Sequence, residues 1–435
     1  MILGGLFTRR GRPKPVDMKD IQHLCRRLLS EAGAANSAAI AAQFIQRYAE
    51  IGPESRLAFF GFLDSALGVD RERLRAAARA YADEPEAKQL RELQRSAEPL
   101  RQELLRRINR APGGVAAIVT MRRDLLKAQR DQPQLRAVDA DFAHLLGSWF
   151  NPGFLNLQQV DWNAPAAMLE KIVRHEAVHQ IRGWNDLRRR LQSDRRCFAF
   201  VHPQLPGEPL IFVEVALVNA MPQSIAQLIG IGAQAQSAGR LRVAVFYSIS
   251  NCEPGLRGVS LGNFLIKRVA MQLQSEISAL RIFCTLSPVP GLRSWLTGFD
   301  GGKRPEGWPA PVHEQVTAAV EALHKRFGQD LDTLATAVRD GTLSAGDRAR
   351  LVQCAAAYLV RETVTERGDA VARFHLDNGA RLERVNVSAD LSAKGLRDSF
   401  GVMVNYRYDL AAVEANHERF VRGEVVASRQ VAALC

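Results

Sequence analysis

The spacing of apolar residues changes once along the chain. From about residue 18 to residue 146, apolar side chains recur at helical spacing and strand-like alternation is absent. The positions that show the repeat include Ile21, Leu24, Leu28, Ile40, Phe44, Leu100, Leu104 and Ile108. Glycine and proline interrupt the pattern near residues 52–53, 83–85 and 111–114. We therefore predict an all-helical N-terminal domain over residues 1–155.

Strand-like and helical runs alternate in the rest of the chain. The run at 210–218 places Ile211, Val213 and Val215 on one face, as a strand does. The other strand-like runs are 197–202, 241–250, 280–286 and 370–387. The helical runs are 165–180, the stretch that ends near 278, and much of 310–365. This mixture predicts an α+β chain whose second domain, residues 156–435, contains a mostly antiparallel sheet.

Composition and charge narrow the function classes. The 435 residues are 47% hydrophobic and 24% charged, and no apolar run reaches the roughly 18 residues that a membrane span needs. The net charge of +12 comes mainly from arginines spread over helical segments, without a basic block interleaved with aromatic residues. We expect no membrane and no nucleic acid as partner. The charge suits a polyanionic small ligand.

The cysteines and the N-terminus bear on the compartment. The six cysteines are scattered and contain no CxxC pair, which favours reduced, buried thiols over disulfides or a zinc knuckle. The first apolar patch precedes the first arginines, an order that is wrong for a secretory signal. We therefore predict a cytoplasmic protein.

A glycine-bearing turn joins the strand-like run at 241–250 to the helix that follows. The turn contains Gly255, Gly258 and Gly262. Glycines let the backbone approach a ligand closely, and the N–H groups at a helix N-terminus face an anion. The segment predicts a phosphate-binding site.

Two further residues are candidates for chemistry. Ser287 follows the run at 280–286 and precedes Pro288, whereas His375 lies before an Asn-Gly turn in a stretch that we predict as a strand. Each residue type is also common in purely structural positions. The surroundings of Ser287 differ from Gly-x-Ser-x-Gly, so an acyl-serine nucleophile is not implied.

A short motif suggests a zinc hydrolase as an alternative. His175-Glu-Ala-Val-His179 matches HExxH, which on a helix places two imidazoles on one face with Glu176 as the base. No Gly-x-x-His extension follows, and no third ligand stands out. A solvated helix face is the simpler interpretation, and we predict no bound metal.

Seven motifs in one order resemble the malonyl-CoA decarboxylase family. The resemblance is dense from about residue 149 to residue 408 and loose in the helical N-terminal part. The Glu176-Ala-Val-His179 stretch with Trp184 also resembles that family. The seven motifs are Pro206-Gly-Glu-Pro-Leu210, Phe246-Tyr-Ser-Ile-Ser250, Gly255-Leu-Arg-Gly-Val-Ser-Leu-Gly262, Phe264-Leu-Ile-Lys-Arg268, Leu286-Ser-Pro-Val-Pro-Gly291, Phe374-His-Leu-Asp-Asn-Gly379 and Asn405-Tyr-Arg-Tyr408.

The resemblance implies a helical domain used in oligomer contacts and a catalytic domain with an acetyltransferase-like (GNAT) fold. The resemblance implies that Ser287 and His375 form the catalytic pair, and that the side chains of Ser248 and Tyr408 line the substrate pocket. The CoA pyrophosphate is expected on the turn formed by Arg257, Gly258, Val259, Ser260, Leu261, Gly262 and Asn263. The turn departs from the usual Gln/Arg-x-x-Gly-x-Gly/Ala pattern. Animal relatives carry a glutamate at the position of Ser260. Because serine has no carboxylate, the resemblance does not assign an acidic role to this position.

The implied reaction is the decarboxylation of malonyl-CoA to acetyl-CoA and CO2. It needs a donor near the thioester oxygen and an acid near the carbon, and it needs no cofactor beyond the CoA of the substrate. A CoA-dependent acyltransferase on the same fold and a non-catalytic acyl-CoA sensor remain open. We further expect a homo-oligomer, a dimer or a tetramer, active in malonate or fatty acid metabolism. The oligomer number, the proton path and the choice between malonyl-CoA and methylmalonyl-CoA are not determined by the sequence.

Overall fold

The computed structural model describes residues 17–30, 36–230, 235, 241–259, 261, 265–365 and 368–435. Two compact units make up the chain. The first contains Met1–Leu155 together with the short segments His202–Pro206 and Glu253–Leu261. The second contains Asn156–Val201, Gly207–Cys252 and Gly262–Cys435.

The first unit is helical, as its apolar spacing predicts. Asp17 and Asp70 cap the first turns of two of the helices by accepting backbone N–H groups, and Pro53 occupies the first turn of a third. Its core includes the neighbouring aromatic rings of Phe44 and Phe59. The helices are α1 (Met18–Leu29), α3 (Ser37–Glu50), α4 (Pro53–Ser65), α5 (Arg71–Asp83), α6 (Ala87–Ala97), α7 (Leu100–Asn109), α8 (Gly114–Ala128) and α9 (Arg136–Trp149).

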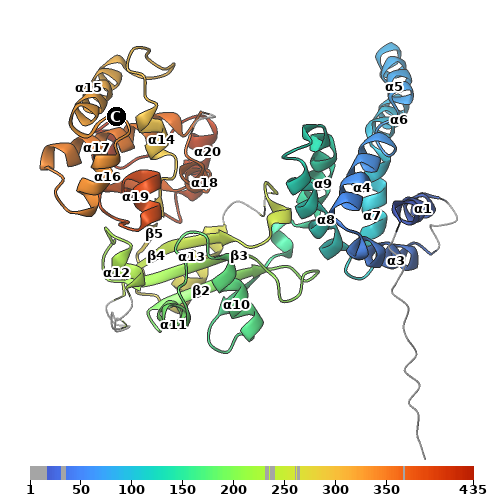
Figure 1. Ribbon diagram of the computed structural model, residues 1–435, viewed down its shortest axis with the longest axis horizontal. Coiled ribbons are helices and arrows are strands. Elements are labelled where there is room, and N and C mark those ends of the chain that lie inside the picture. The colour runs from blue at the N-terminus through green and yellow to red at the C-terminus, as the bar shows by residue number, and fades with distance from the viewer. Residues whose placement is uncertain are drawn as a thin grey trace, which may run out of the picture. The chain divides into compact units, whose positions relative to one another are not determined.

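The second unit contains one mixed sheet with the order β1-β2-β3-β4-β5-β8-β6, and β7 pairs with β8 (Figure 1). Among the described strands, β4 and β5 pair in parallel and the other ladders are antiparallel. This arrangement confirms the α+β class that the sequence predicted. The strands are β1 (Asn156–Val160), β2 (Arg195–Val201), β3 (Pro209–Val218), β4 (Val243–Asn251), β5 (Ile282–Thr285), β6 (Ser287–Pro288), β7 (Arg381–Asn386) and β8 (Met403–Tyr408).

Helices accompany this sheet. In Figure 1 the later helices, from α14 to α20, gather near the strand labelled β5. The earlier helices are α10 (Ala166–His175), α11 (Trp184–Arg190), α12 (Ala226–Ile229) and α13 (Leu265–Glu276). The later helices are α14 (Leu292–Thr297), α15 (Ala310–Phe327), α16 (Asp332–Arg339), α17 (Ala345–Ala357), a π-helical turn (Tyr358–Glu362), α18 (Ala370–Asp377), α19 (Ala393–Ser399), α20 (Val413–Val421) and α21 (Arg429–Ala432).

The prediction of a strand over residues 370–387 was wrong for its first half. Residues Ala370–Asp377 form helix α18, and the strand β7 is confined to Arg381–Asn386. The helix forms because Asp369 caps it and because Ala372, His375 and Leu376 bury one face at helical spacing.

The structure also differs from the prediction in the end of one helix and in one further strand. The helix expected to reach residue 180 ends at His175, because the Glu176 side chain accepts the N–H groups of Val178 and His179 and folds the chain into a turn. Strand β1 was missed, since its residues are mostly polar and it pairs at the edge of the sheet.

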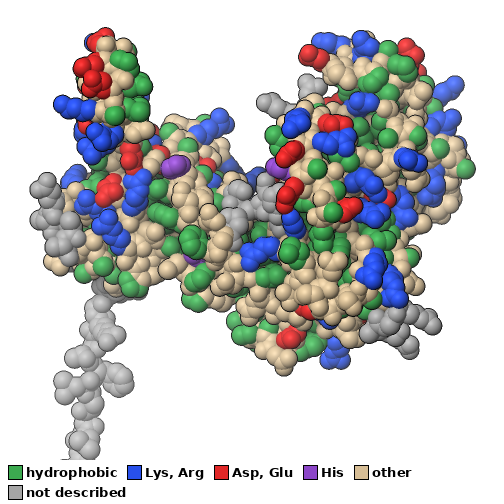
Figure 2. All heavy atoms as spheres, turned by 180° about the vertical axis from the view of Figure 1, so that it is seen from behind, with side chains coloured by type: hydrophobic (Ala, Val, Ile, Leu, Met, Phe, Trp, Pro, Cys, Tyr) green, Lys and Arg blue, Asp and Glu red, His purple; other side chains and the backbone are tan. Residues whose placement is uncertain are grey.

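The charged side chains on the surface are mixed in sign. Figure 2 shows Lys and Arg side chains scattered over one face, with acidic side chains among them, instead of gathered in a single stripe. Among the described residues, no helix is both long and apolar enough to cross a membrane.

Candidate active site

Ser287 lies in the short strand β6, which pairs with β8 so that Ser287 faces Val404 across the ladder. Its side chain is buried, and its Oγ lies 2.9 Å from Thr285 Oγ1, to which it is placed to donate. Asn405 fixes the same corner of the sheet by donating from Nδ2 to the Thr285 carbonyl at 2.8 Å. The serine therefore sits on a rigid part of the sheet.

His375 reaches Ser287 from helix α18. Its Nε2 lies 2.8 Å from Ser287 Oγ, and its Nδ1 lies 2.8 Å from the hydroxyl of Tyr408 on β8. The imidazole stacks on the ring of Tyr406, with 4.6 Å between the ring centroids. A hydrogen-bonded chain thus runs from Tyr408 through His375 to Ser287. Its members come from a helix and two strands that are far apart in sequence.

Burial determines the charge states of the hydrogen-bonded side chains His375 and Tyr408 and of the neighbouring Tyr406. The side chain of His375 is 3% exposed, and its burial lowers the pKa of the imidazole to about 3. Burial also raises the pKa of Tyr408 and Tyr406 well above the ordinary value of a phenol. The three groups are therefore neutral near pH 7, so one ring nitrogen of His375 donates a hydrogen bond and the other accepts one.

We expect His375 to show no titration between about pH 8 and about pH 5, because its folded-state pKa lies below this window. The measurement is the ¹⁵N chemical shift of the imidazole over that range, with the resonance identified by its loss in the His375→Gln variant. In denaturant the same imidazole should titrate near about 6.5, the ordinary value. A midpoint inside the window in the folded protein would contradict the prediction.

Ser248, which we predicted to line the substrate pocket, lies on β4, and its hydroxyl forms hydrogen bonds with other side chains of the protein. Its hydroxyl donates to Glu176 Oε2 at 2.7 Å, and Ser250 Oγ lies 3.4 Å away. Among the described residues, no hydrogen bond joins it to Ser287 or His375. The Glu176 carboxylate therefore holds Ser248, and its other oxygen accepts two backbone N–H groups.

The arrangement required by the HExxH alternative is absent from this part of the chain. Helix α10 ends at His175, so His175 and His179 do not share a helix face. His179 is buried, and this burial lowers its pKa to about 4. The described residues contain no group of three or more His, Cys, Asp or Glu side chains placed to hold a metal.

The first residues of the predicted phosphate-binding turn are closely packed. Its start, the 3-10 turn Pro254–Leu256, packs on α8: a Cβ on Gly255 would lie 2.2 Å from the carbonyl oxygen of Val119, and Arg122 donates to the Gly255 carbonyl at 2.9 Å. Only glycine permits that approach. The chain then turns through Gly258, which has a positive φ of 75°.

The structure describes only some of the remaining residues of the predicted phosphate-binding turn. Arg257 is exposed, whereas Val259 and Leu261 are buried. Ser260, Gly262 and Asn263 lie outside the described residues. Helix α13 follows at Leu265, in the order that the predicted anion site requires.

Sequence reasoning missed two side chains of the candidate active site. Thr285 contacts Ser287, and Tyr406 stacks on His375. The signal for Tyr406 was present, because residues two apart on a strand share a face and Tyr408 was already a candidate. Nothing in the local sequence marks Thr285.

Comparison with known families gives two adjacent matches. The malonyl-CoA decarboxylase C-terminal domain matches residues 153–435, and the malonyl-CoA decarboxylase N-terminal domain matches residues 67–150. Malonyl-CoA decarboxylase, mitochondrial, from Mus musculus is 36% identical over 347 residues, which are 76% of this chain and 70% of that protein. The protein of the same name from Anser anser anser is 36% identical over 343 residues, covering 75% and 68% of the two chains.

Solved structures agree with the sequence relatives. The crystal structure of malonyl-CoA decarboxylase from Rhodopseudomonas palustris superposes with a TM-score of 0.83 at 43% identity, covering 96% of this chain and 100% of that one. The structure of malonyl-CoA decarboxylase from Agrobacterium vitis gives a TM-score of 0.81 at 42% identity, covering 95% and 99% of the two chains.

Proposed function

The chain belongs to the malonyl-CoA decarboxylase family and decarboxylates malonyl-CoA, and we propose that the buried pair Ser287 and His375 carries the reaction. The observation that supports this mechanism is the 2.8 Å contact between Ser287 Oγ and His375 Nε2. A second hydrogen bond continues from His375 Nδ1 to the hydroxyl of Tyr408. Such a contact between a hydroxyl and an imidazole is what proton transfer requires.

The first step breaks the bond between the α-carbon and the carboxylate of malonyl-CoA. The electron pair of that bond moves into the thioester, CO2 leaves, and the thioester oxygen becomes an enolate. The Ser287 hydroxyl stabilises this developing charge as a hydrogen-bond donor. No metal or organic cofactor is needed, because the thioester itself accepts the electron pair.

The second step protonates the α-carbon. The carboxylate of the bound substrate raises the pKa of His375, which takes up one proton as the substrate binds. The buried imidazolium is a strong acid, so it gives its Nε2 proton to Ser287 as Ser287 gives its own hydroxyl proton to the α-carbon. Substrate and one proton thus become acetyl-CoA and CO2, and both side chains end neutral.

The CoA part of the substrate is assigned to the turn before α13. The pyrophosphate binds at Arg257, at the backbone of Gly258, Val259 and Leu261, and at Ser260, Gly262 and Asn263, which are not described. Tyr408 contributes by orienting His375, and Ser248 on β4 is assigned to the substrate pocket as part of this proposal.

Replacing Arg257 tests this assignment. We expect Arg257→Ala to raise the KM for malonyl-CoA about tenfold and to leave kcat within about twofold, because a charge-assisted bond to phosphate contributes to ground-state and transition-state binding alike. Initial rates over a range of substrate concentrations give both constants. Arg188→Ala, which removes another exposed arginine, is the matched control. An unchanged KM in Arg257→Ala would remove this residue from the binding site.

The decisive test of the function is direct. Purified protein is incubated with malonyl-CoA, without added metal or acceptor, and acetyl-CoA is followed by chromatography. Stoichiometric acetyl-CoA and CO2 establish the cofactor-independent decarboxylase. Acylated product that forms only with an added amine would indicate the acyltransferase, and intact malonyl-CoA with a folded protein would indicate the acyl-CoA sensor.

The proposal also covers the compartment, the oligomeric state and the metabolic role of the enzyme. We propose a cytoplasmic homo-oligomer, a dimer or a tetramer assembled through the helical domain, that acts in malonate or fatty acid metabolism. The six cysteines are free and five of them are buried, which suits the reducing cytoplasm. Light scattering of the full chain and of a variant without the helical domain tests the assembly.

A further inference from the structure

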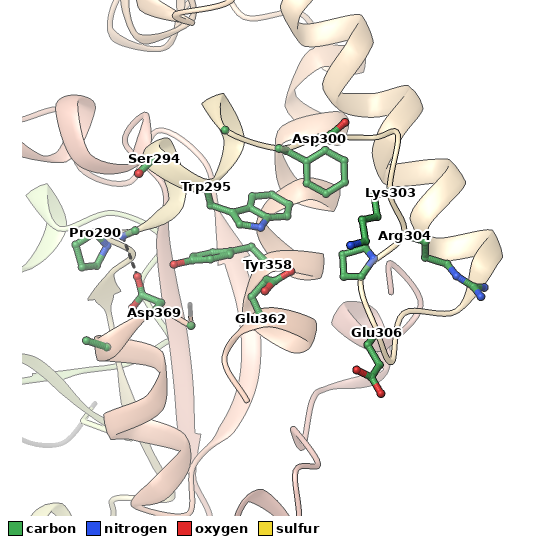
Figure 3. Close-up of a pocket in the computed structure, with 16 residues that line it drawn as sticks. Pro290, Ser294, Trp295, Asp300, Lys303, Arg304, Glu306, Tyr358, Glu362 and Asp369 are labelled. Carbon is green, nitrogen blue, oxygen red and sulfur yellow. Dashed lines mark hydrogen bonds between the residues drawn. The ribbon is translucent and has the colours of Figure 1, made fainter. Parts of the chain in front are cut away.

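One buried carboxylate connects the two segments that carry Ser287 and His375. Asp369 is 2% exposed. Its Oδ1 accepts the backbone N–H groups of Val371 at 2.9 Å and Ala372 at 3.0 Å, and its Oδ2 accepts the N–H of Gly291 at 3.0 Å. Figure 3 shows the last of these bonds as the dashed line between Asp369 and the chain beside Pro290.

Both ends of this bridge lead directly to the candidate active site. Asp369 is the N-cap of α18, and His375 lies on that helix. Gly291 ends the segment that starts at Ser287 and contains Pro288 and Pro290. Because the prolines restrict that segment and the helix is rigid, the bond between Gly291 and Asp369 ties α18 to the segment that carries Ser287, in addition to the pairing of β6 with β8.

Close packing holds Gly291 in this position. A Cβ on Gly291 would lie 2.1 Å from the Tyr358 hydroxyl oxygen and 3.3 Å from Asp369 Oδ2. The Tyr358 ring in turn packs against Trp295, with 5.1 Å between the ring centroids (Figure 3). The backbone of Gly291 is therefore confined between the phenol and the carboxylate, and only glycine fits there.

We propose that Asp369 is a positioning residue for the decarboxylation: its carboxylate joins the cap of the His375 helix to the end of the Ser287 segment and so sets the Ser287–His375 distance. This role rests on the proposed function of that pair. It differs from ordinary helix capping. Asp70 caps α5 through Oδ1 with two backbone N–H groups and is exposed, and no bond from its other oxygen to a distant segment is recorded among the described residues.

Two substitutions separate the bridge from the cap. In Asp369→Ser the hydroxyl retains the cap but is too short to reach Gly291, because serine is as good an N-cap as aspartate. In Asp369→Asn the amide oxygen can retain the cap, while the amide nitrogen faces the Gly291 N–H, donor against donor. Both variants therefore lose the bond to Gly291 selectively.

We expect each variant to lower kcat by about 10- to 30-fold and to leave KM within about twofold, since a misplacement of about 1 Å costs up to about a hundredfold in rate without weakening substrate binding. The ¹⁵N shift of His375 should move in both variants, because its Nε2 contact with Ser287 changes. Asp70→Ser and Asp70→Asn are the matched controls and should change neither quantity. Initial rates and the imidazole resonance are measured on full-length protein.

The possible results lead to separate conclusions. If Ser287→Ala and His375→Ala are inactive but both Asp369 variants keep kcat within about twofold of wild type, the positioning role is wrong and the proposed function stands. If Ser287→Ala retains the wild-type rate, the proposed mechanism itself fails. If neither Asp369 variant folds, as judged by circular dichroism, Asp369 serves stability and the positioning role is overturned.

Discussion

The Ser287→Ala variant should convert malonyl-CoA at least about 100-fold more slowly than the wild type, with KM changed by no more than a few fold. The hydroxyl is the donor that stabilises the enolate oxygen and relays the proton, and a single donor of this kind contributes about two to three orders of magnitude to kcat. Because that interaction strengthens only as charge develops, its loss appears in kcat and leaves substrate binding nearly intact.

The measurement is the rate of acetyl-CoA formation at saturating substrate. Ser294→Ala is the matched control, since Ser294 is an exposed serine on α14 that lies outside the proposed mechanism. Its rate should equal that of the wild type. Alanine leaves β6 and its pairing with β8 intact, because the ladder uses the backbone. A Ser287→Ala rate near wild type would remove this residue from the chemistry.

The class of the fold could be predicted because central strands of the sheet, such as β3 and β4, are compact apolar runs. The runs at 210–218 and 241–250 became β3 and β4 with shifts of one or two residues at their ends. Polar strands are different. β1 is stabilised by its pairing with β2, a tertiary contact that leaves no apolar pattern in residues 156–160.

The local structure around His375 shows why the secondary structure of its segment was predicted wrongly. The motif order singled out His375, but its helix was predicted as a strand because the residues Ala370-Val-Ala-Arg-Phe contain apolar side chains compatible with either period. The deciding signal was Asp369, whose carboxylate caps the first turn. The same aspartate also binds Gly291, and no local pattern predicts a bond across 78 positions.

The candidate active site itself could be predicted only as a set of residue types. The sequence places Ser287 and His375 88 positions apart, and their contact depends on the pairing of β6 and β7 with β8 and on the cap of α18. The HExxH match shows that a motif can have the right residue types without the geometry that they need. Its spacing is meaningful only on a continuous helix, and the side chain of Glu176 ends that helix by binding its own backbone.

His375→Ala should lower kcat by about two to four orders of magnitude, the range expected when a general acid is lost. The effect should be at least as large as that of Ser287→Ala, because the imidazole both supplies the proton and holds the serine at 2.8 Å. Removing it also takes away the partner of the Tyr408 hydroxyl and the ring that stacks on Tyr406.

The His375→Gln variant separates these contributions. Its amide can keep a hydrogen bond to Ser287 but cannot take up and release a proton near neutral pH. We therefore expect His375→Gln to fold like the wild type, to bind acetyl-CoA with similar affinity, and still to lose at least about 100-fold in kcat. If His375→Gln retained more than about a tenth of the wild-type rate, the imidazole would act only by holding Ser287, and the proton would have to reach the α-carbon from another donor. Loss of rate in both variants, with binding retained, would leave proton transfer by His375 as the explanation that accounts for its burial, its neutral resting state and its contact with the serine.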